Sequence, residues 1–218
     1  MKPTKPLASP SEFLQRLQWR YATKKFDPAK KIPADVWRSL EEAIILSPSS
    51  YGLQPWKAVV ISDPALRSKL RTASWDQPQI TDASHMIVFA YRRNIDKAYV
   101  EMFVKRIADV RKVPVDSLAA YGKMMTGSVE GGVKDINAWS QRQTFIGLGV
   151  FLVSAAVLGI DACPMEGFDP LKYDELLGLP AQGCNALVVA TAGYRAADDA
   201  YAKDAKVRFA REDLIATM

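Results

Sequence analysis

A run of 17 residues without a charged side chain, 144–160 (TFIGLGVFLVSAAVLGI), is the strongest constraint on how this chain folds. A segment of this length lies at the lower limit for a membrane-spanning helix. Asp135, Arg142 and Asp161 flank the run closely, and the sequence contains no second run of this kind. We therefore predict a buried central helix over 135–159 and no membrane span.

The overall composition is that of an ordinary globular protein. Hydrophobic residues make up 49% and charged residues 24% of the 218 residues, which argues against a disordered chain. We find no internal repeat and no linker that would divide the sequence. The prediction is a single domain over 1–218, with a flexible arm at about 1–9 and an extended tail at about 198–218.

Start signals predict several helices around the central one. Ser9-Pro10-Ser11-Glu12 forms a capping box, and Pro33, Asp63-Pro64 and Asp169-Pro170 open further helices. Residues 94–125 are predicted to be helical with a break near Pro114, followed by a flexible link over 127–132. Short β-branched runs predict strands at 57–62, 86–91 and 185–192. This layout predicts an α+β sandwich in which helices cover a small sheet.

Cysteine usage and the N-terminal sequence indicate the compartment. Cys163 and Cys184 form no C-x-x-C pair and belong to no zinc-binding cluster, which favours buried thiols in a reducing environment. The first ten residues lack the apolar core of a signal peptide. We expect a cytoplasmic protein without a bound metal.

The usual side-chain motifs of catalysis are missing. Gly147 and Gly149 lie inside the apolar helix and do not follow a strand, so they do not form a dinucleotide-binding loop. No G-x-S-x-G motif is present, and the single histidine, His85, is expected to be structural. If the protein is an enzyme, a cofactor is expected to carry the chemistry.

Basic residues gather near both ends of the chain, within a net charge of +5. They either form two separate solvated patches or converge on one anion, such as a cofactor phosphate. The residues concerned are Lys2, Lys5, Arg20, Lys24 and Lys25 at one end, and Lys203, Lys206, Arg208 and Arg211 at the other.

Four segments in a fixed order add a family resemblance that covers about residues 11–210. The chain resembles the nitroreductase family of FMN-dependent NAD(P)H oxidoreductases. The resemblance implies a helix–sheet–helix sandwich, an intertwined homodimer with FMN at the subunit interface, and NADH or NADPH as co-substrate. The segments are RYATKKF (20–26), SPSSYGLQPW (47–56), PMEGF (164–168), and GYR (193–195) with KVR (206–208) in the tail.

The resemblance implies that basic side chains contact the phosphate end and the pyrimidine end of the flavin. It implies that Arg20, Lys206 and Arg208 bind the phosphate and that Tyr21 and Ala22 lie beside the cofactor. It also places Lys24 near flavin N1 and O2, where an ammonium group stabilises the reduced anion. The alternative for Lys24 is an ordinary surface lysine.

The remaining cofactor contacts are implied for two loops and one helix. Pro48, Ser49 and Ser50, with Gly52 beside them, are implied to reach the flavin of the other subunit. Gln143 either contacts the flavin or ribityl chain or is a polar residue at a helix boundary. The resemblance places Pro164, Met165, Glu166 and Gly167 along the isoalloxazine ring, with a backbone N–H of Glu166 or Gly167 directed at N5.

Three positions depart from the family pattern. Asp76 stands where asparagine is usual, and a carboxylate accepts hydrogen bonds but cannot donate one to flavin O4. Asp76 therefore either turns away from the ring or tunes it differently. Gln79 stands where some members have lysine, and Ala22 stands where serine is common. Tyr51, Phe103 and Tyr121 either line the pocket or pack in the core.

The activity implied is the two-electron reduction of nitroaromatics, quinones or similar flat acceptors in a ping-pong cycle. The chemistry would take place on the flavin, tuned by Lys24, Glu166 and Gly167, without a dedicated catalytic side chain. The alternatives are a flavin-storage protein without turnover, or a specialised member that fragments flavin or removes halogen reductively. A nucleic-acid-binding domain has no supporting recognition motif.

Overall fold

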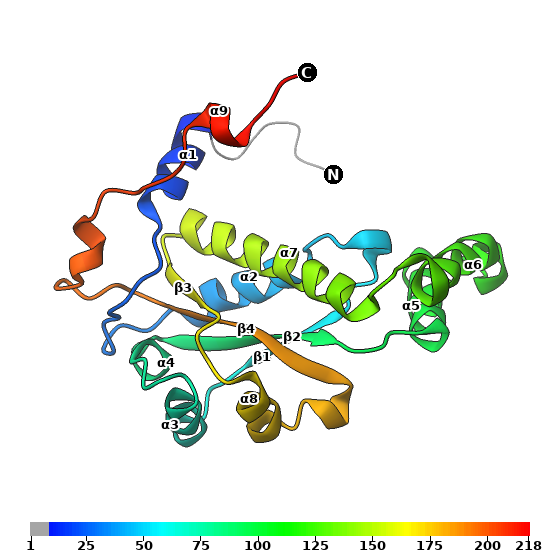
Figure 1. Cartoon of the computed structure of the whole chain (residues 1–218), viewed down its shortest axis with the longest axis horizontal. Coiled ribbons are helices and arrows are strands. Elements are labelled where there is room, and N and C mark those ends of the chain that lie inside the picture. The colour runs from blue at the N-terminus through cyan, green and yellow to red at the C-terminus, as the bar shows by residue number, and fades with distance from the viewer. Residues whose placement is uncertain (1–8) are drawn as a thin grey trace.

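The computed structural model describes residues 9–218, and its centre is an antiparallel sheet (Figure 1). The strand order is β1-β2-β4-β3, so the two longest strands lie in the middle. In the register of the sheet, Val88 of β2 pairs with Val59 of β1 on one side and with Val189 of β4 on the other. The strands are β1 (Trp56–Val60), β2 (His85–Arg92), β3 (Asp161–Met165) and β4 (Cys184–Gly193).

Helices cover both faces of the sheet. On one face lie α2 (Ala34–Ile45) and α7 (Ile136–Val157), and on the other lie α3 (Pro64–Thr72), α4 (Gln79–Asp82) and α8 (Pro170–Leu177) (Figure 1). Strand side chains alternate between the two layers, which is why β2 is buried throughout its centre. This arrangement confirms the α+β prediction and yields two separate cores.

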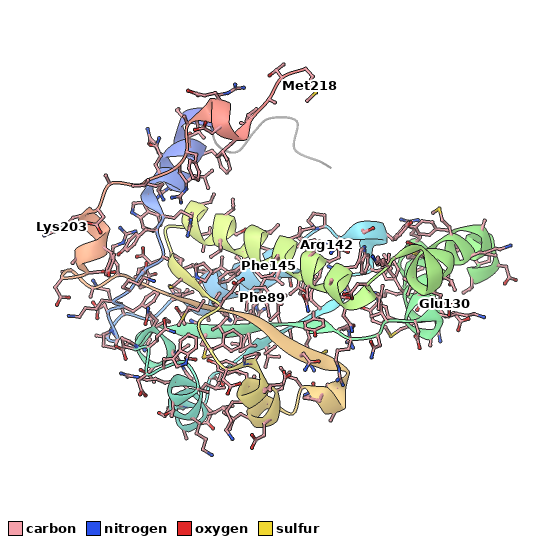
Figure 2. The ribbon with its side chains drawn as sticks, viewed as in Figure 1. Phe89, Glu130, Arg142, Phe145, Lys203 and Met218 are labelled. Carbon is pink, nitrogen blue, oxygen red and sulfur yellow. The ribbon has the colours of Figure 1, made fainter. Side chains whose placement is uncertain are left out.

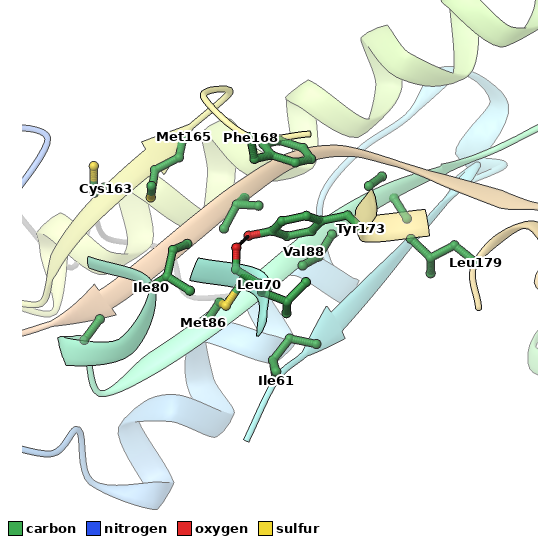
Figure 3. Packing of buried hydrophobic residues seen from close by; sticks show 14 of the residues in the cluster. Ile61, Leu70, Ile80, Met86, Val88, Cys163, Met165, Phe168, Tyr173 and Leu179 are labelled. Atoms are coloured by element: carbon green, nitrogen blue, oxygen red, sulfur yellow. Dashed lines mark hydrogen bonds between the residues drawn. The ribbon is translucent and has the colours of Figure 1, made fainter. Parts of the chain in front are cut away.

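Each face has its own core. On the α3–α4–α8 side, Met86 and Val88 of β2 pack with Leu70, Phe168 and the fully buried Tyr173 (Figure 3). The phenol of Tyr173 donates to the backbone carbonyl of Leu70 at 3.4 Å, so its polar end is satisfied. The core on the α2–α7 side contains Trp37, Leu40, Ile87, Phe89 and Phe151.

The central helix α7 begins where the sequence indicates. Asp135 caps it by accepting a 2.9 Å hydrogen bond from the backbone N–H of Ala138. Only one face is covered, however: Phe145 and Arg142 lie on the exposed side, whereas Phe89 is fully buried between sheet and helix (Figure 2). In one chain the prediction of a buried helix therefore holds for one face of α7. Within residues 9–218 no helix is long and apolar enough to cross a membrane.

A helical excursion extends beyond the sheet between β2 and α7 (Figure 1). It consists of α5 (Lys97–Arg111), a 3₁₀ turn at Val115–Leu118, and α6 (Ala119–Gly127), in agreement with the predicted break near Pro114. The prediction of a flexible link over 127–132 is wrong. These residues form a π-helical turn, Ser128–Gly132, that continues α6 and buries Val129 against the excursion's own core.

Other differences concern short elements. Strand β3 is not predicted from the sequence because it contains Pro164, which a sheet tolerates here because β3 is an edge strand. Helix α4 was also missed. The tail is not simply extended, because it contains a 3₁₀ turn at Ala200–Lys203 and α9 (Arg211–Leu214). Two more 3₁₀ turns lie at Ser50–Gly52 and Pro180–Gln182.

At the N-terminus, α1 (Pro10–Trp19) has the predicted capping box. The Ser9 hydroxyl accepts from the N–H of Glu12, whose carboxylate accepts in return from the N–H of Ser9 at 2.9 Å. The predicted flexible arm at about 1–9 lies outside the described residues except for Ser9.

Candidate functional site

The two ends of the described chain meet around one cavity of about 510 Å³. Its walls come from Gln18–Lys24 on one side and from Tyr201–Arg208 on the other. The ammonium group of Lys206 donates to the backbone carbonyl of Arg20, 186 positions away in sequence. The predicted convergence is therefore confirmed for Arg20, Lys24, Lys206 and Arg208. The other basic residues do not line this cavity, and Lys2 and Lys5 lie outside the described residues.

The cations in this cavity repel one another. Burial lowers the pKa of Arg20, and the neighbouring Arg208 lowers it further. The pKa of Lys206 is lowered by burial and then by Arg20 and Arg208. Asp204 is the one carboxylate that lines the cavity in residues 9–218, against Arg20, Lys24, Lys206 and Arg208. Such a surplus of fixed positive charge favours an anion.

The segment that carries Arg20 and Lys24 is attached to the sheet at two points. Ala22 forms a parallel bridge with Ala162 on β3, and Phe26 forms an antiparallel bridge with Arg195 beyond β4. Directly before the first of these points, the phenol of Tyr21 donates a 2.8 Å hydrogen bond to Asp199. Burial and this hydrogen bond raise the pKa of Tyr21 to about 12. The cavity wall is thus a fixed part of the fold.

Arg195 stabilises the same wall from behind. Its guanidinium lies over the rings of Trp19 and Tyr21, 4.4 Å and 4.5 Å from their centroids. It also pairs with the buried Asp161, whose Oδ1 accepts from Nε at 2.8 Å and whose Oδ2 accepts from the backbone N–H of Arg195 at 2.9 Å. One arginine therefore joins α1, β3 and the chain after β4.

The residues expected along a flavin ring lie at the end of β3 and in the loop after it. Pro164 belongs to β3, opposite Ala190, and the side chain of Met165 points into the core (Figure 3). Glu166 is exposed and Gly167 partly so. Of this segment, the backbone after Met165 and the Glu166 side chain are therefore accessible to a ligand.

Gly167 is held tightly by the loop that precedes α4. A Cβ atom at this position would lie 2.7 Å from the ring of Trp75 and 3.3 Å from the amide nitrogen of Gln77. The Gln77 amide donates to the carbonyl of Gly167 at 2.7 Å, and the N–H of Asp169 donates to the carbonyl of Ala73 at 2.8 Å. A side chain at this position would require the Trp75 ring or the loop to move.

That second loop is strained and partly exposed. Trp75 and Asp76 have φ values of 52° and 57°, in the left-handed region that is costly for residues with a side chain. Trp75 is nevertheless 71% exposed, so burial of its ring within the chain does not offset the strain. Strain of this kind clusters at functional sites.

Asp76 and Gln79, two of the positions that depart from the family pattern, differ in their environment. The side chain of Asp76 is exposed, and its backbone N–H and C=O are held by Arg71. Gln79 is buried, and its carbonyl oxygen has no hydrogen-bond partner in the part of the chain that the structure describes. Such unpaired buried oxygens are rare in folded proteins.

The remaining predicted contacts form a third group. Gln143 on α7 accepts a 2.9 Å hydrogen bond from the N–H of Ser50, and the hydroxyl of Ser49 accepts from the N–H of Gln54 at 2.8 Å. Gly52 has a φ of 76°, as the tight turn beside Pro48 requires. None of these residues lines the cavity that contains Arg20, so one chain does not bring them to it.

The predicted pocket residues Tyr51, Phe103 and Tyr121 pack against the core of the helical excursion. His85 stacks on Trp37 at 4.0 Å and accepts or donates at 3.0 Å with Ser84, as a structural histidine does. Sequence reasoning missed Asp161 and Asp199. Nothing in the local sequence distinguishes Asp199, which is buried, from the exposed Asp198 beside it.

An antiparallel sheet lies between two helical layers, and a cavity with a surplus of cations lies where the N-terminal and C-terminal segments meet, which defines an α+β protein with a site suited to an anion. The nitroreductase family model matches residues 17–194, and the chain belongs to this family. A Staphylococcus epidermidis protein named "Putative NAD(P)H nitroreductase" is 34% identical over 212 residues, which cover 93% of this chain and 94% of the relative.

Solved structures share the fold at lower identity. A nitroreductase-like protein from Streptococcus mutans has a TM-score of 0.82 at 19% identity and covers 95% of this chain and 98% of its own. An Exiguobacterium sibiricum protein solved in complex with FMN has a TM-score of 0.80 at 19% identity, over 99% and 100% of the two chains.

Proposed function

We propose that this protein is an FMN-dependent oxidoreductase that uses NADH or NADPH to reduce nitroaromatics, quinones or similar flat acceptors in a ping-pong cycle. The observation that carries the proposal is the convergence of Arg20, Lys206 and Arg208 in one cavity. A phosphate monoester is close to a dianion at neutral pH and is bound best by fixed guanidinium and ammonium groups. Family membership and the FMN complex of the E. sibiricum protein support this assignment.

The other residues fit FMN as well. A cavity of about 510 Å³ lies within the usual range for ligand sites. The backbone at Gly167 has no side chain to keep a flat ring at a distance. The cavity around Arg20 would hold the phosphate, and the Glu166–Gly167 backbone, which does not line that cavity, would meet the ring.

When bound, FMN supplies the chemistry, accepting hydride from the nicotinamide and passing two electrons to the acceptor. The chain's own part is binding and electrostatics. Lys24 would place an ammonium group near the pyrimidine end, where it stabilises negative charge. Glu166 and Gly167 would offer a backbone N–H to the reactive edge. No side chain is needed as a general acid, because solvent can deliver the protons.

We further propose that the active form is an intertwined homodimer. Exposed apolar residues follow one side of α7, among them Phe145, Ile146 and Val157. A second copy that packs on this side would bring its Pro48–Ser50 loop and Gln143 toward the cavity, which lacks them in one chain. The interface would then complete each FMN site.

The C-terminal tail would supply a second contact for the dimer. The apolar side chains of the tail are exposed, and a groove of about 850 Å³ lies between α2, β1 and α5, beside the edge strand β1. If each copy placed its tail in the groove of the other, the apolar side chains of the tail and the groove would both be covered. The exposed tail residues are Val207, Phe209, Leu214 and Ile215.

The proposal is tested by visible spectroscopy. The purified protein is expected to show flavin absorption at about 450 nm, to lose it when NADH or NADPH is added without oxygen, and to regain it on addition of nitrofurazone or menadione. A colourless protein that does not take up added FMN would overturn the proposal. A yellow protein that neither nicotinamide bleaches would support the storage alternative.

A further inference from the structure

We infer that Asp199 is the positioning residue that holds the two halves of the cationic cavity together and so controls affinity for the phosphate of a flavin nucleotide. The inference rests on the proposed function. Asp199 is 3% exposed and lies in the chain segment between β4 and Lys206. Its side chain forms no ion pair within residues 9–218, and the side-chain hydrogen bonds go to the stretch Tyr21–Lys25 and to Tyr201, that is, to the two chain segments that carry the cavity walls.

One oxygen of Asp199 binds the N-terminal half of the cavity wall. Oδ2 accepts from the phenol of Tyr21 at 2.8 Å and from the backbone N–H groups of Lys24 and Lys25, each at 3.1 Å. Three donors on one carboxylate oxygen fix the path of the chain from Tyr21 to Lys25. This stretch follows Arg20 directly and includes Lys24.

The other oxygen binds the C-terminal half. Oδ1 accepts from the N–H of Tyr201 at 3.2 Å and caps the 3₁₀ turn at Ala200–Lys203. This turn leads the chain to Lys206 and Arg208. Asp199 thus connects both cation-bearing segments through a single carboxylate, and their separation is set by its geometry.

The charge of Asp199 suits this role. Burial acts to raise its pKa, but hydrogen bonds from Tyr21 and from the backbone of Lys25, Lys24 and Tyr201 outweigh burial and hold the pKa below its usual value. The group is therefore ionised at neutral pH. Asparagine has the same shape but only one accepting oxygen, so its NH₂ group would face donors on one side.

The adjacent residue, Asp198, provides a matched control. Asp198 is exposed, with a side chain 68% accessible, and its carboxylate pairs with the ammonium of Lys25 at the surface. Asp198→Asn changes the same charge at the adjacent position without touching the cavity wall. Tyr21→Phe removes one of the three donors to Oδ2 and leaves the carboxylate in place.

The experiment compares FMN with riboflavin, which has the same ring and ribityl chain but no phosphate. Flavin-free full-length protein is titrated with each compound, and Kd is measured by quenching of flavin fluorescence, with circular dichroism as a check of folding. For Asp199→Asn we expect the Kd for FMN to rise about tenfold or more, as the loss of one charge-assisted hydrogen bond implies, and the Kd for riboflavin to rise far less. Tyr21→Phe is expected to be intermediate, and Asp198→Asn unchanged.

The outcomes separate the two claims. Equal weakening of FMN and riboflavin by Asp199→Asn would mean that the residue only maintains the fold and would overturn the inference, as would an Asp199→Asn protein that binds FMN like Asp198→Asn. If Asp199→Asn does not fold, Tyr21→Phe decides by the same FMN-to-riboflavin ratio. A wild-type protein that binds no FMN would overturn the proposed function as well.

Discussion

The side-chain amide of Gln77 donates a 2.7 Å hydrogen bond to the backbone carbonyl of Gly167, 90 positions further along the chain. With the ring of Trp75 against the same glycine, this bond locks the loop after β3 to the loop before α4. The backbone that is proposed to face the flavin is therefore held from behind. Its position depends on contacts that local sequence does not reveal.

Substitution of Gly167 by alanine is expected to destabilise the protein by about 1–3 kcal/mol, as overpacking does. The new Cβ would lie 2.7 Å from Trp75, so the ring or the loop must move. We also expect reduced turnover of NAD(P)H, because the Glu166–Gly167 backbone would be displaced. Urea unfolding and steady-state kinetics measure the two effects.

Gly127 provides the control for this substitution. It lies in α6 with helical φ and ψ, and a Cβ there meets no atom within 4 Å. Gly127→Ala is expected to be neutral or slightly stabilising. In the Gly167→Ala background, Trp75→Ala is expected to recover part of the loss. No recovery would show that the ring contact is not the cause.

Loss of the Arg195–Asp161 pair is expected to weaken the fold strongly. Asp161→Asn leaves the guanidinium without its buried partner, and the expected loss is about 3 kcal/mol of unfolding free energy. Chemical denaturation at neutral pH measures it. The exposed Lys25–Asp198 pair is the comparison, and Lys25→Gln is expected to leave the unfolding midpoint unchanged. Similar losses for both would contradict the role given to Asp161.

Stability is expected to fall between pH 10 and pH 12. Burial raises the pKa of both Tyr21 and Tyr173 from 10.0 to about 12. The folded state holds these protons more tightly than the unfolded state, so the stabilisation is complete below pH 10 and is lost as pH rises toward 12. Urea unfolding at pH 9 and pH 11 measures the decline.

The variant Tyr173→Phe identifies the group responsible. It removes the titrating phenol and also its contact with Ser74 at 2.7 Å. We expect the variant to be less stable at pH 9 but to lose less stability than wild type between pH 9 and pH 11. An equal decline in both proteins would assign the alkaline loss to other groups.

The proposed dimer is tested on the exposed side of α7. Phe145→Glu places a charge on the apolar stripe and is expected to shift the protein from dimer to monomer in sedimentation velocity. Leu171→Glu is the control, because Leu171 is equally apolar and more exposed but lies on α8, across the sheet. A Phe145→Glu protein that sediments like wild type would contradict the interface on α7.

Several elements are determined by short-range chemistry, and the sequence predicts them well. The capping box at Ser9, the cap at Asp135 and the proline starts at Pro64 and Pro170 all define helix ends as expected. These signals act over three or four residues, so both interacting residues lie within one short stretch of sequence. The three β-branched strands were identified for the same reason.

Short elements whose local sequence disfavours them could not be predicted from short-range signals. Strand β3 exists because β4 offers it a partner, although Pro164 argues against a strand. The turn at Ser128–Gly132 has three small or glycine residues, yet it is helical because Val129 is buried against the excursion. In both cases the decisive energy comes from neighbours distant in sequence.

The candidate site divides along the same line. Residue types and their order predicted the cations, which the structure brings into one cavity. The roles given to the Pro48–Ser50 loop and the Pro164–Gly167 segment by the family resemblance stay predictions. Only the tertiary structure decided that Arg20 and Arg208 share one cavity. It also decided that Asp199, and not Asp198, is buried between the two segments that carry these arginines. The same holds for the ring of Trp75, which occupies the space where a side chain at position 167 would lie. Those relationships depend on loops closed over more than 90 residues, whose geometry is set by packing of the whole sheet and is not encoded in any one segment.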